Sequence, residues 1–182
     1  EIAVVPHAKL LGVVISKDLK WILHVDYICK KAAKRLLALR LLKRCSIPTD
    51  KLVRVFVTCI RPVLEYSCEV WHYSLPQYLS DEIERIQRRA LCIIFPELNY
   101  DEAMDRADVV TLFQRRNSIC ARFFDRIYSD TPHKLHRLTP PRHETPYHLR
   151  QNNCLEIAKY ETNRFLNTFI IASCKRHNAN ND

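Results

Sequence analysis

The chain combines 182 residues, a single glycine and a formal net charge of +9, from 29 lysines and arginines against 20 aspartates and glutamates. Because glycine normally supplies about 7% of residues, this scarcity excludes a P-loop and a glycine-rich dinucleotide turn. The charge favours a polyanionic partner, nucleic acid before a membrane surface. No apolar run approaches the length of a membrane span, so we expect no membrane partner.

The cysteines are spread along the chain without the closely spaced pairs of a zinc ribbon or knuckle. Most of them fall where an amphipathic helix needs a small apolar residue. We therefore expect reduced cysteines in an intracellular protein of the cytoplasm, the nucleus or both.

Two short apolar stretches rich in β-branched residues, 3–5 and 10–15, predict two strands near the N-terminus. Pro6 lies between them, and the only glycine, Gly12, lies in the second. Together they predict a short β-hairpin.

The first helix is predicted from Val25 to about Arg44, where an apolar stripe repeats with a helical period. The stripe consists of Val25, Ile28, Cys29, Ala32, Leu36 and Leu39. Four basic residues lie off this stripe or at its margin: Lys30, Lys31, Lys34 and Arg35.

The second helix is predicted to begin at Thr49 and to contain Pro62, which removes a backbone hydrogen bond and predicts a kink or a break. The third is predicted to begin with Ser80 as its N-cap and to end before Pro96. It carries three outward-facing arginines, Arg85, Arg88 and Arg89.

A short helix is expected at 100–107, and a longer one from Thr111 that carries Arg115 and Arg116. The stretch 131–151 is rich in proline and histidine, which predicts an extended linker. An apolar patch and a polar tail follow. The chain is therefore predicted to be mostly α, with a short N-terminal β-hairpin, a helical bundle and an irregular C-terminal extension, in three segments: 1–22, 23–130 and 131–182.

Three groups of polar residues have the composition of a chemical site, and each has a simpler structural explanation. The acidic pairs at 81–82 and 101–102 lie near helix starts, where the helix dipole alone favours carboxylates. His24 and Asp26 match part of a facial iron triad, but the chain lacks the strands that carry such triads. A loose group whose spacing fits no compact metal site consists of His133, His136, His143, His148 and Cys154. We expect no catalytic residue and no metal ligand.

The cationic helix faces admit two explanations. Phosphate groups need only well-placed cations, and the free energy of binding then comes from counterion release. A run of charged residues is equally typical of a solvated helix face. Charge alone leaves both explanations open.

Specific segments favour the first explanation. Segments 9–13 (Lys-Leu-Leu-Gly-Val) and 18–25 resemble the region after the catalytic palm strands in reverse transcriptases of non-LTR (LINE-type) retrotransposons. Further segments resemble the same family in the same order: 59–66, 70–72, 75–80, 83–91, 112–116 and 164–170. There are two departures: Ile171 stands where the family often has proline, and no Cys/His knuckle follows.

The resemblance implies that the chain is the primer grip, thumb and C-terminal extension of a polyprotein that copies RNA into DNA. The hairpin at 9–15 would grip the primer end, and the helices from Val25 would contact the backbone of the template–primer duplex. Its partners would be that RNA/DNA duplex and the rest of the parent polyprotein. The aspartates that hold Mg²⁺ would lie upstream, as the missing initiator Met also suggests. This fragment is therefore expected to hold no cofactor and to catalyse nothing.

The residues expected to contact nucleic acid are basic, apart from one glycine and one tryptophan: Lys9, Gly12, Lys20, Trp21, Lys30, Lys31, Lys34, Arg35, Arg85, Arg88 and Arg89. Trp21 would either stack on a sugar or base or anchor the junction between strand and helix. A thumb reads backbone rather than bases, which suits lysine-rich faces.

Two other interpretations stay open. The chain can be a non-catalytic helical module that binds a protein, and a salt titration would distinguish it from a phosphate binder. Residues 9 to about 44 also resemble a small N-terminal module attached to AlkB-type tRNA-modifying dioxygenases and methyltransferases. That similarity includes no iron site and no methyl-donor site.

Overall fold

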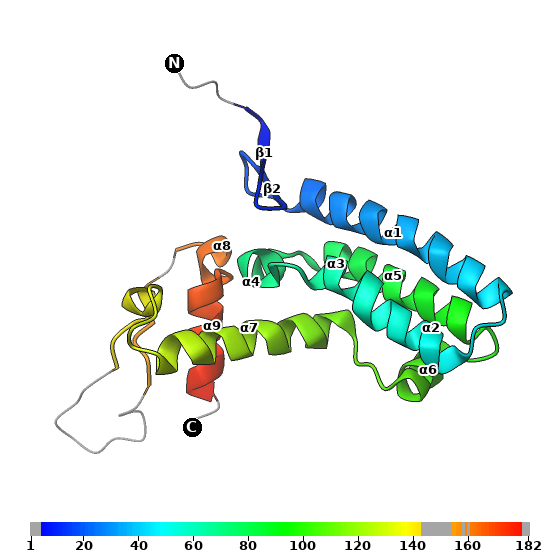
Figure 1. The fold of residues 1–182 in the computed structure, drawn as a ribbon. Coiled ribbons are helices and arrows are strands. Elements are labelled where there is room, and N and C mark those ends of the chain that lie inside the picture. Colours follow the sequence, from blue (N-terminus) through cyan, green and yellow to red (C-terminus); the bar gives the residue numbers. More distant parts are fainter. Residues whose placement is uncertain (1–4, 143–153, 158, 160, 180–182) are drawn as a thin grey trace. The chain divides into compact units, whose positions relative to one another are not determined.

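The computed structural model describes residues 5–142, 154–157, 159 and 161–179. It is 67% helical with a short antiparallel hairpin at the N-terminal end, which confirms the predicted fold class (Figure 1). The chain forms two compact units. Unit 1 comprises Glu1–Ser67 and Leu75–Arg115, and unit 2 comprises Cys68–Ser74 and Arg116–Asp182. These units divide the chain at other points than the three segments expected from the sequence.

The hairpin of unit 1 consists of β1 (His7–Leu10) and β2 (Val13–Ser16). Only Leu11 and Gly12 separate the last residue pair, and both have positive φ, +47° and +89°. Two positive φ values in a two-residue loop are the pattern of a type I′ turn, whose twist matches that of the strands it joins.

The predicted strand positions were wrong although the hairpin itself is present. The turn lies inside the stretch 10–15 that was expected to be a strand, because Gly12 supplies the positive φ that ends β1 there. Of the other expected strand, 3–5, only Val5 is described, and it belongs to no strand.

The first helix, α1 (Ile22–Arg44), begins ahead of the predicted Val25 and ends where expected. Its buried stripe consists of His24, Val25, Ile28, Ala32, Leu36 and Leu39. It packs along α5 (Gln77–Ile94), and the two helices run in the same direction. Cys29 Sγ donates to the Glu82 carbonyl at 3.8 Å near one end, and Lys43 Nζ donates to the Ile94 carbonyl at 2.9 Å near the other.

The next helical segment passes through Pro62 without a break. It consists of α2 (Thr49–Val55), a π-helical turn η1 (Phe56–Ile60) and α3 (Arg61–Glu65), which has the proline in its first turn. A π turn adds a residue to the helical repeat and a proline is tolerated where a helical turn begins. The π-helical turn η1 therefore accommodates the proline, and the helical segment continues without the expected break.

The third predicted helix, α5, begins at Gln77 after Pro76, so the assignment of Ser80 as its N-cap was wrong. Ser80 is buried inside the helix. The following helix, α6 (Tyr100–Ala107), lies where it was predicted. Its N-cap Asn99 and Glu102 form a reciprocal capping box.

Unit 2 contains most of α7, which the sequence placed correctly, and, among its described residues, five shorter helical elements. The bounds are α4 (Cys68–Trp71), η2 (His72–Ser74), α7 (Leu112–Ser129), η3 (His136–Leu138), α8 (Asn163–Leu166) and α9 (Phe169–Ala179). One cluster of its core contains Phe124, Leu155 and Cys174. The expectation of an irregular tail was wrong for 163–179, because α9 buries Ile171 and Cys174 and so has a packing reason to be helical.

Candidate nucleic-acid interface

Lys9 lies on the exposed strand β1 and contacts α1. Its Nζ donates to the Tyr27 hydroxyl at 2.8 Å and lies 4.4 Å from the centroid of the Tyr27 ring, which adds a cation–π contact. The hydrogen bond from Lys9 lowers the pKa of the Tyr27 phenol, and the charges of Lys9 and Lys31 act in the same direction. Lys9 and Lys31 are therefore both close to this ring.

Two features of the structure favour glycine at position 12: its positive φ and its close contact with Tyr66. The Tyr66 hydroxyl donates to the Leu11 carbonyl at 2.9 Å, which holds the tyrosine ring against the turn. A Cβ at Gly12 would lie 3.2 Å from Tyr66 Cε1, tighter than most real Cβ contacts. The ring of Tyr66 remains 53% exposed, so the turn and this ring share one surface.

Lys30, Lys31 and Lys34 of α1 are exposed and lie off its buried stripe, as expected. Lys30 forms an ion pair with Asp26 at 2.7 Å. In the part of the chain that the structure describes, Lys31 and Lys34 form no ion pair. Residues four and three apart on a helix are neighbours, so Tyr27, Lys31 and Lys34 follow one another along the same face. We call Lys9, Lys31 and Lys34 the lysine row.

Arg35 has a structural role that the sequence did not indicate. Its Nη1 donates to the carbonyl oxygen of Cys59, which lies in the π-helical turn η1. This hydrogen bond joins α1 to η1.

The arginines of α5 form a second group. All three are exposed, and the guanidinium of Arg88 lies 4.4 Å from the centroid of the Tyr100 ring on α6.

The position of the lysine row on α1 follows from two contacts of that helix. Cys29 contacts α5, whereas Arg35, four residues after Lys31, contacts η1. The lysine row therefore lies along the flank of α1 next to η1. The structure does not gather these arginines and that row into one face.

Two residues at the start of α1 complete the expected set. Trp21 is 8% exposed, and its ring meets His24 edge-on at 6.2 Å between centroids, so it packs into the junction between strand and helix. That is the anchoring alternative considered above. Lys20 is exposed and lies 3.5 Å from Asp18.

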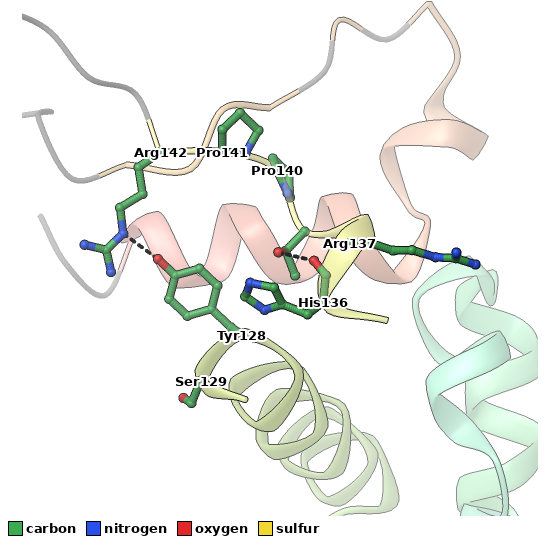
Figure 2. Close-up of a pocket in the computed structure, with 8 residues that line it drawn as sticks. Tyr128, Ser129, His136, Arg137, Pro140, Pro141 and Arg142 are labelled. Carbon is green, nitrogen blue, oxygen red and sulfur yellow. Dashed lines mark hydrogen bonds between the residues drawn. The ribbon is translucent and has the colours of Figure 1, made fainter. Parts of the chain in front are cut away.

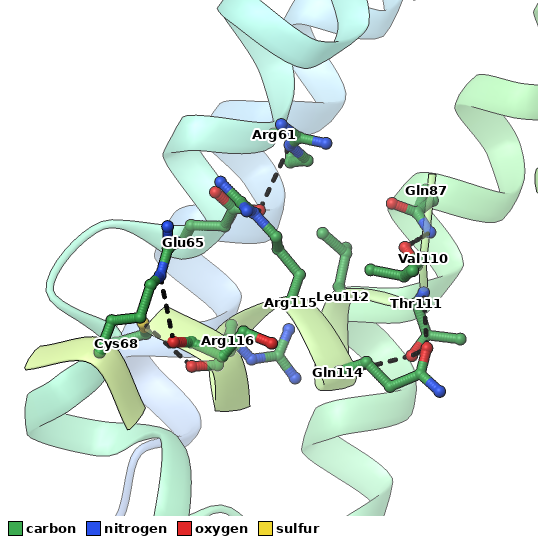
Figure 3. A network of polar contacts seen from close by, with 12 residues as sticks. Arg61, Glu65, Cys68, Gln87, Val110, Thr111, Leu112, Gln114, Arg115 and Arg116 are labelled. Carbon is green, nitrogen blue, oxygen red and sulfur yellow. Dashed lines mark hydrogen bonds and ion pairs between the residues drawn. The ribbon is translucent and has the colours of Figure 1, made fainter. Parts of the chain in front are cut away.

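The arginines near the start of α7 are held inside their units. In unit 1, Glu65 Oε1 accepts a hydrogen bond from Arg115 Nε at 3.3 Å and forms an ion pair with Arg61 Nε, also at 3.3 Å (Figure 3). In unit 2, Arg116 is 0% exposed. The idea that Arg115 and Arg116 add to an outward cationic face was therefore wrong for the buried Arg116 and weak for Arg115, which shares the Glu65 carboxylate with Arg61.

Two tyrosines belong to this surface although the sequence reasoning did not single them out. Tyr27 had a local signal, since it lies four residues before Lys31 on the same helix face. Tyr66 had none, because its contact with the turn joins residues far apart in the chain.

No metal centre is formed in the part of the chain that the structure describes, where no three potential ligands come together. His24 is buried, accepts a hydrogen bond from the Val14 amide at 3.2 Å, and has its pKa lowered by burial to about 4. Asp26 pairs with Lys30 instead. His143 and His148 lie outside the described residues. Among the described helices, none has the length and apolar composition to cross a membrane.

Comparisons with known proteins add no family to this geometry. No family model matches the sequence, no curated protein matches it, and no solved structure matches the fold. The functional interpretation therefore depends on the residues and contacts of this chain.

Proposed function

We propose that the chain is the C-terminal part of a non-LTR retrotransposon reverse transcriptase, comprising primer grip, thumb and extension, in which unit 1 contacts the backbone of an RNA/DNA template–primer duplex. The ordered segments described above support the family. The observation that carries the contact is the lysine row, which begins beside the Gly12 turn and continues along α1 without a carboxylate partner among the described residues.

The row is suited to phosphate rather than to bases. Lys31 and Lys34 are one helical turn apart, and Lys9 extends the row onto β1 through Tyr27. Lysine ammonium groups at such positions neutralise phosphates and release counterions, which gives affinity without sequence specificity. The type I′ turn at Gly12 exposes backbone that can approach a duplex closely. In this proposal Mg²⁺ and the catalytic aspartates belong to the upstream part of a cytoplasmic or nuclear polyprotein.

The test is a salt titration of binding to a short RNA–DNA hybrid. The affinity of the wild-type chain should fall steeply with salt concentration. Replacing Lys31 and Lys34 together with Ala should reduce the magnitude of the log–log slope by about 2, near one unit for each lost phosphate contact. The matched control replaces Lys51 and Arg106, exposed cations of α2 and α6, and should leave the slope close to the wild-type value.

The rival, a helical module that binds a protein, has one observation in its favour. Leu10 and Leu11 at the hairpin tip are 61% and 84% exposed, an apolar surface of the kind that protein partners cover. Such a module should respond little to salt. Equal slopes for the lysine variant and its control would reject the phosphate-binding proposal.

A further inference from the structure

A cavity of about 690 Å³ lies in unit 2, beside the end of α7. Its described lining comes from 128–129, 136–137 and 139–142 (Figure 2). The volume falls within the range of about 300–1,000 Å³ that small-molecule sites occupy. None of the residues proposed to contact a duplex lies in this unit.

The wall of the cavity is held by hydrogen bonds on three sides. His136 Nδ1 bonds to the Ile127 carbonyl at 3.0 Å, and Thr139 Oγ1 donates to the His136 carbonyl at 2.6 Å. The Pro141 carbonyl accepts from the Glu156 amide at 3.0 Å. Pro140 precedes it, and two prolines in succession fix the backbone further. A site whose walls are fixed before binding loses little entropy when a ligand enters.

The polar groups of the cavity are suited to an anion. Arg142 Nε donates to the Tyr128 hydroxyl at 2.5 Å, and the guanidinium carbon lies 5.6 Å from the centroid of that ring. This contact orients the guanidinium and uses one of its five N–H donors. Because a carbonyl can only accept, Nδ1 of His136 carries the proton, so Nε2 of the neutral ring is an acceptor and offers no donor to an anion.

The charge around the cavity is one-sided. None of the described lining residues is acidic. Arg137 also lines the cavity, but its side chain extends away from Arg142 in Figure 2. The positive charge beside Tyr128 therefore comes from Arg142, whose guanidinium lies at the Tyr128 hydroxyl.

We propose that this cavity binds a nucleoside monophosphate group. A guanidinium fork pairs with two phosphate oxygens at once, and the two prolines offer an apolar wall for a flat base. The group can come from a free mononucleotide or from the phosphorylated end of a single strand. The inference is independent of the proposed function of unit 1.

The experiment is calorimetry on the full chain with UMP and AMP as ligands. We expect dissociation constants on the order of 0.1 mM, and binding at least about tenfold weaker for the nucleosides that lack phosphate. Arg142→Gln should weaken nucleotide binding at least about tenfold, because the charged fork is lost. Tyr128→Phe, which removes only the hydroxyl that orients Arg142, should weaken it about threefold.

Arg126→Gln is the matched control, because Arg126 is an exposed arginine of α7 that does not line the cavity, and it should bind like the wild type. Trp71, buried in unit 2, reports the fold of each variant through its ¹⁹F signal after fluorotryptophan labelling. If a 5′-phosphorylated RNA oligonucleotide binds more tightly than UMP, the natural ligand is the end of a strand. If the two bind with equal affinity, the natural ligand is a free nucleotide.

Three outcomes would overturn the proposal: no binding at about 1 mM nucleotide, nucleosides binding as well as nucleotides, or a folded Arg142→Gln variant that equals the control. The Lys31→Ala/Lys34→Ala variant should bind mononucleotide like the wild type. Failure of this proposal therefore leaves the duplex-binding test of unit 1 unaffected.

Discussion

The lysines of α1 in unit 1 and Arg116 of α7 in unit 2 differ in burial although all are basic residues of amphipathic helices. In unit 1, Lys31 and Lys34 of α1 are exposed and off the apolar stripe. In unit 2, Arg116 of α7 is 0% exposed, its Nε donates to His72 Nδ1 at 3.3 Å, and its guanidinium carbon lies 5.6 Å from the centroid of the Trp71 ring. A basic residue in an amphipathic helix can therefore be a surface group, as Lys31 and Lys34 are in unit 1 and Arg126 is in unit 2, or a core group, as Arg116 is.

The difference follows from position along the helix. Leu112, Arg116, Cys120 and Phe124 are each four residues apart, so the arginine lies on the buried stripe of α7. Lys31 and Lys34 fall between the buried positions of α1. Counting charges does not distinguish these cases, whereas their register against the apolar residues does.

The largest effect should come from removing the buried arginine. Arg116→Ala is expected to lower the free energy of unfolding of unit 2 by about 3–5 kcal/mol, because it leaves a cavity and removes the partner of buried His72. Arg116→Met, of similar volume and uncharged, should cost far less. Urea unfolding followed by the ¹⁹F signals of Trp21 in unit 1 and Trp71 in unit 2 measures each unit. Equal losses for Ala and Met would mean that the charge, rather than the volume, stabilises the core.

The buried histidines make both units acid-sensitive. Burial lowers the pKa of His24 to about 4, and burial together with the Arg116 charge lowers that of His72 to about 4. Unfolded histidine has a pKa near 6.5, so between about pH 6.5 and pH 4 the unfolded state binds more protons than the folded state. The free energy of unfolding therefore decreases as the pH is lowered through this range. At about 1.4 kcal/mol for each pKa unit, the loss is on the order of 3 kcal/mol per histidine.

The two fluorine signals test this in each unit separately. His24→Gln should flatten the pH dependence of unit 1 alone, and His72→Gln that of unit 2 alone. A pH dependence in unit 1 that survives His24→Gln would point to another group.

The hairpin turn should show a smaller effect. Gly12→Ala is expected to lower the stability of unit 1 by about 1–2 kcal/mol, since alanine is strained at positive φ. Its methyl group also meets Tyr66. Gly12→Asn should cost less, because asparagine tolerates this φ better, and Gly12→Ala in a Tyr66→Ala background separates the contact from the strain. Urea unfolding measures all three.

The smallest effect on stability should come from the lysine row. Lys31→Ala/Lys34→Ala is expected to change the free energy of unfolding by no more than about 0.5 kcal/mol, as is usual for exposed side chains. Arg35→Ala should cost more, near 1 kcal/mol, because it removes the hydrogen bond to the Cys59 carbonyl. Thermal unfolding ranks the two variants, and the reverse order would mean that the row is structural and Arg35 is not.

Local signals predicted some of the site. The hairpin, the exposed lysines of α1 and the position of α6 were all predicted from the pattern of apolar and β-branched residues. The pairing of Arg35 with Cys59 and of Tyr66 with the turn joins segments that are distant in sequence. No sequence pattern within either segment predicts which distant residue it contacts.

By itself, the sequence determined that this protein is a helical bundle with one hairpin, because the 3.6-residue apolar period and the near absence of glycine admit little else. Tertiary structure alone decided which of the cations are used by other parts of the chain. Lys31 and Lys34 form no ion pair among the described residues, whereas Arg35 and Arg115 meet acceptors on other elements. The physical reason is that a long cationic side chain takes its role from the groups within reach of its charged end, and folding assembles those groups from several elements.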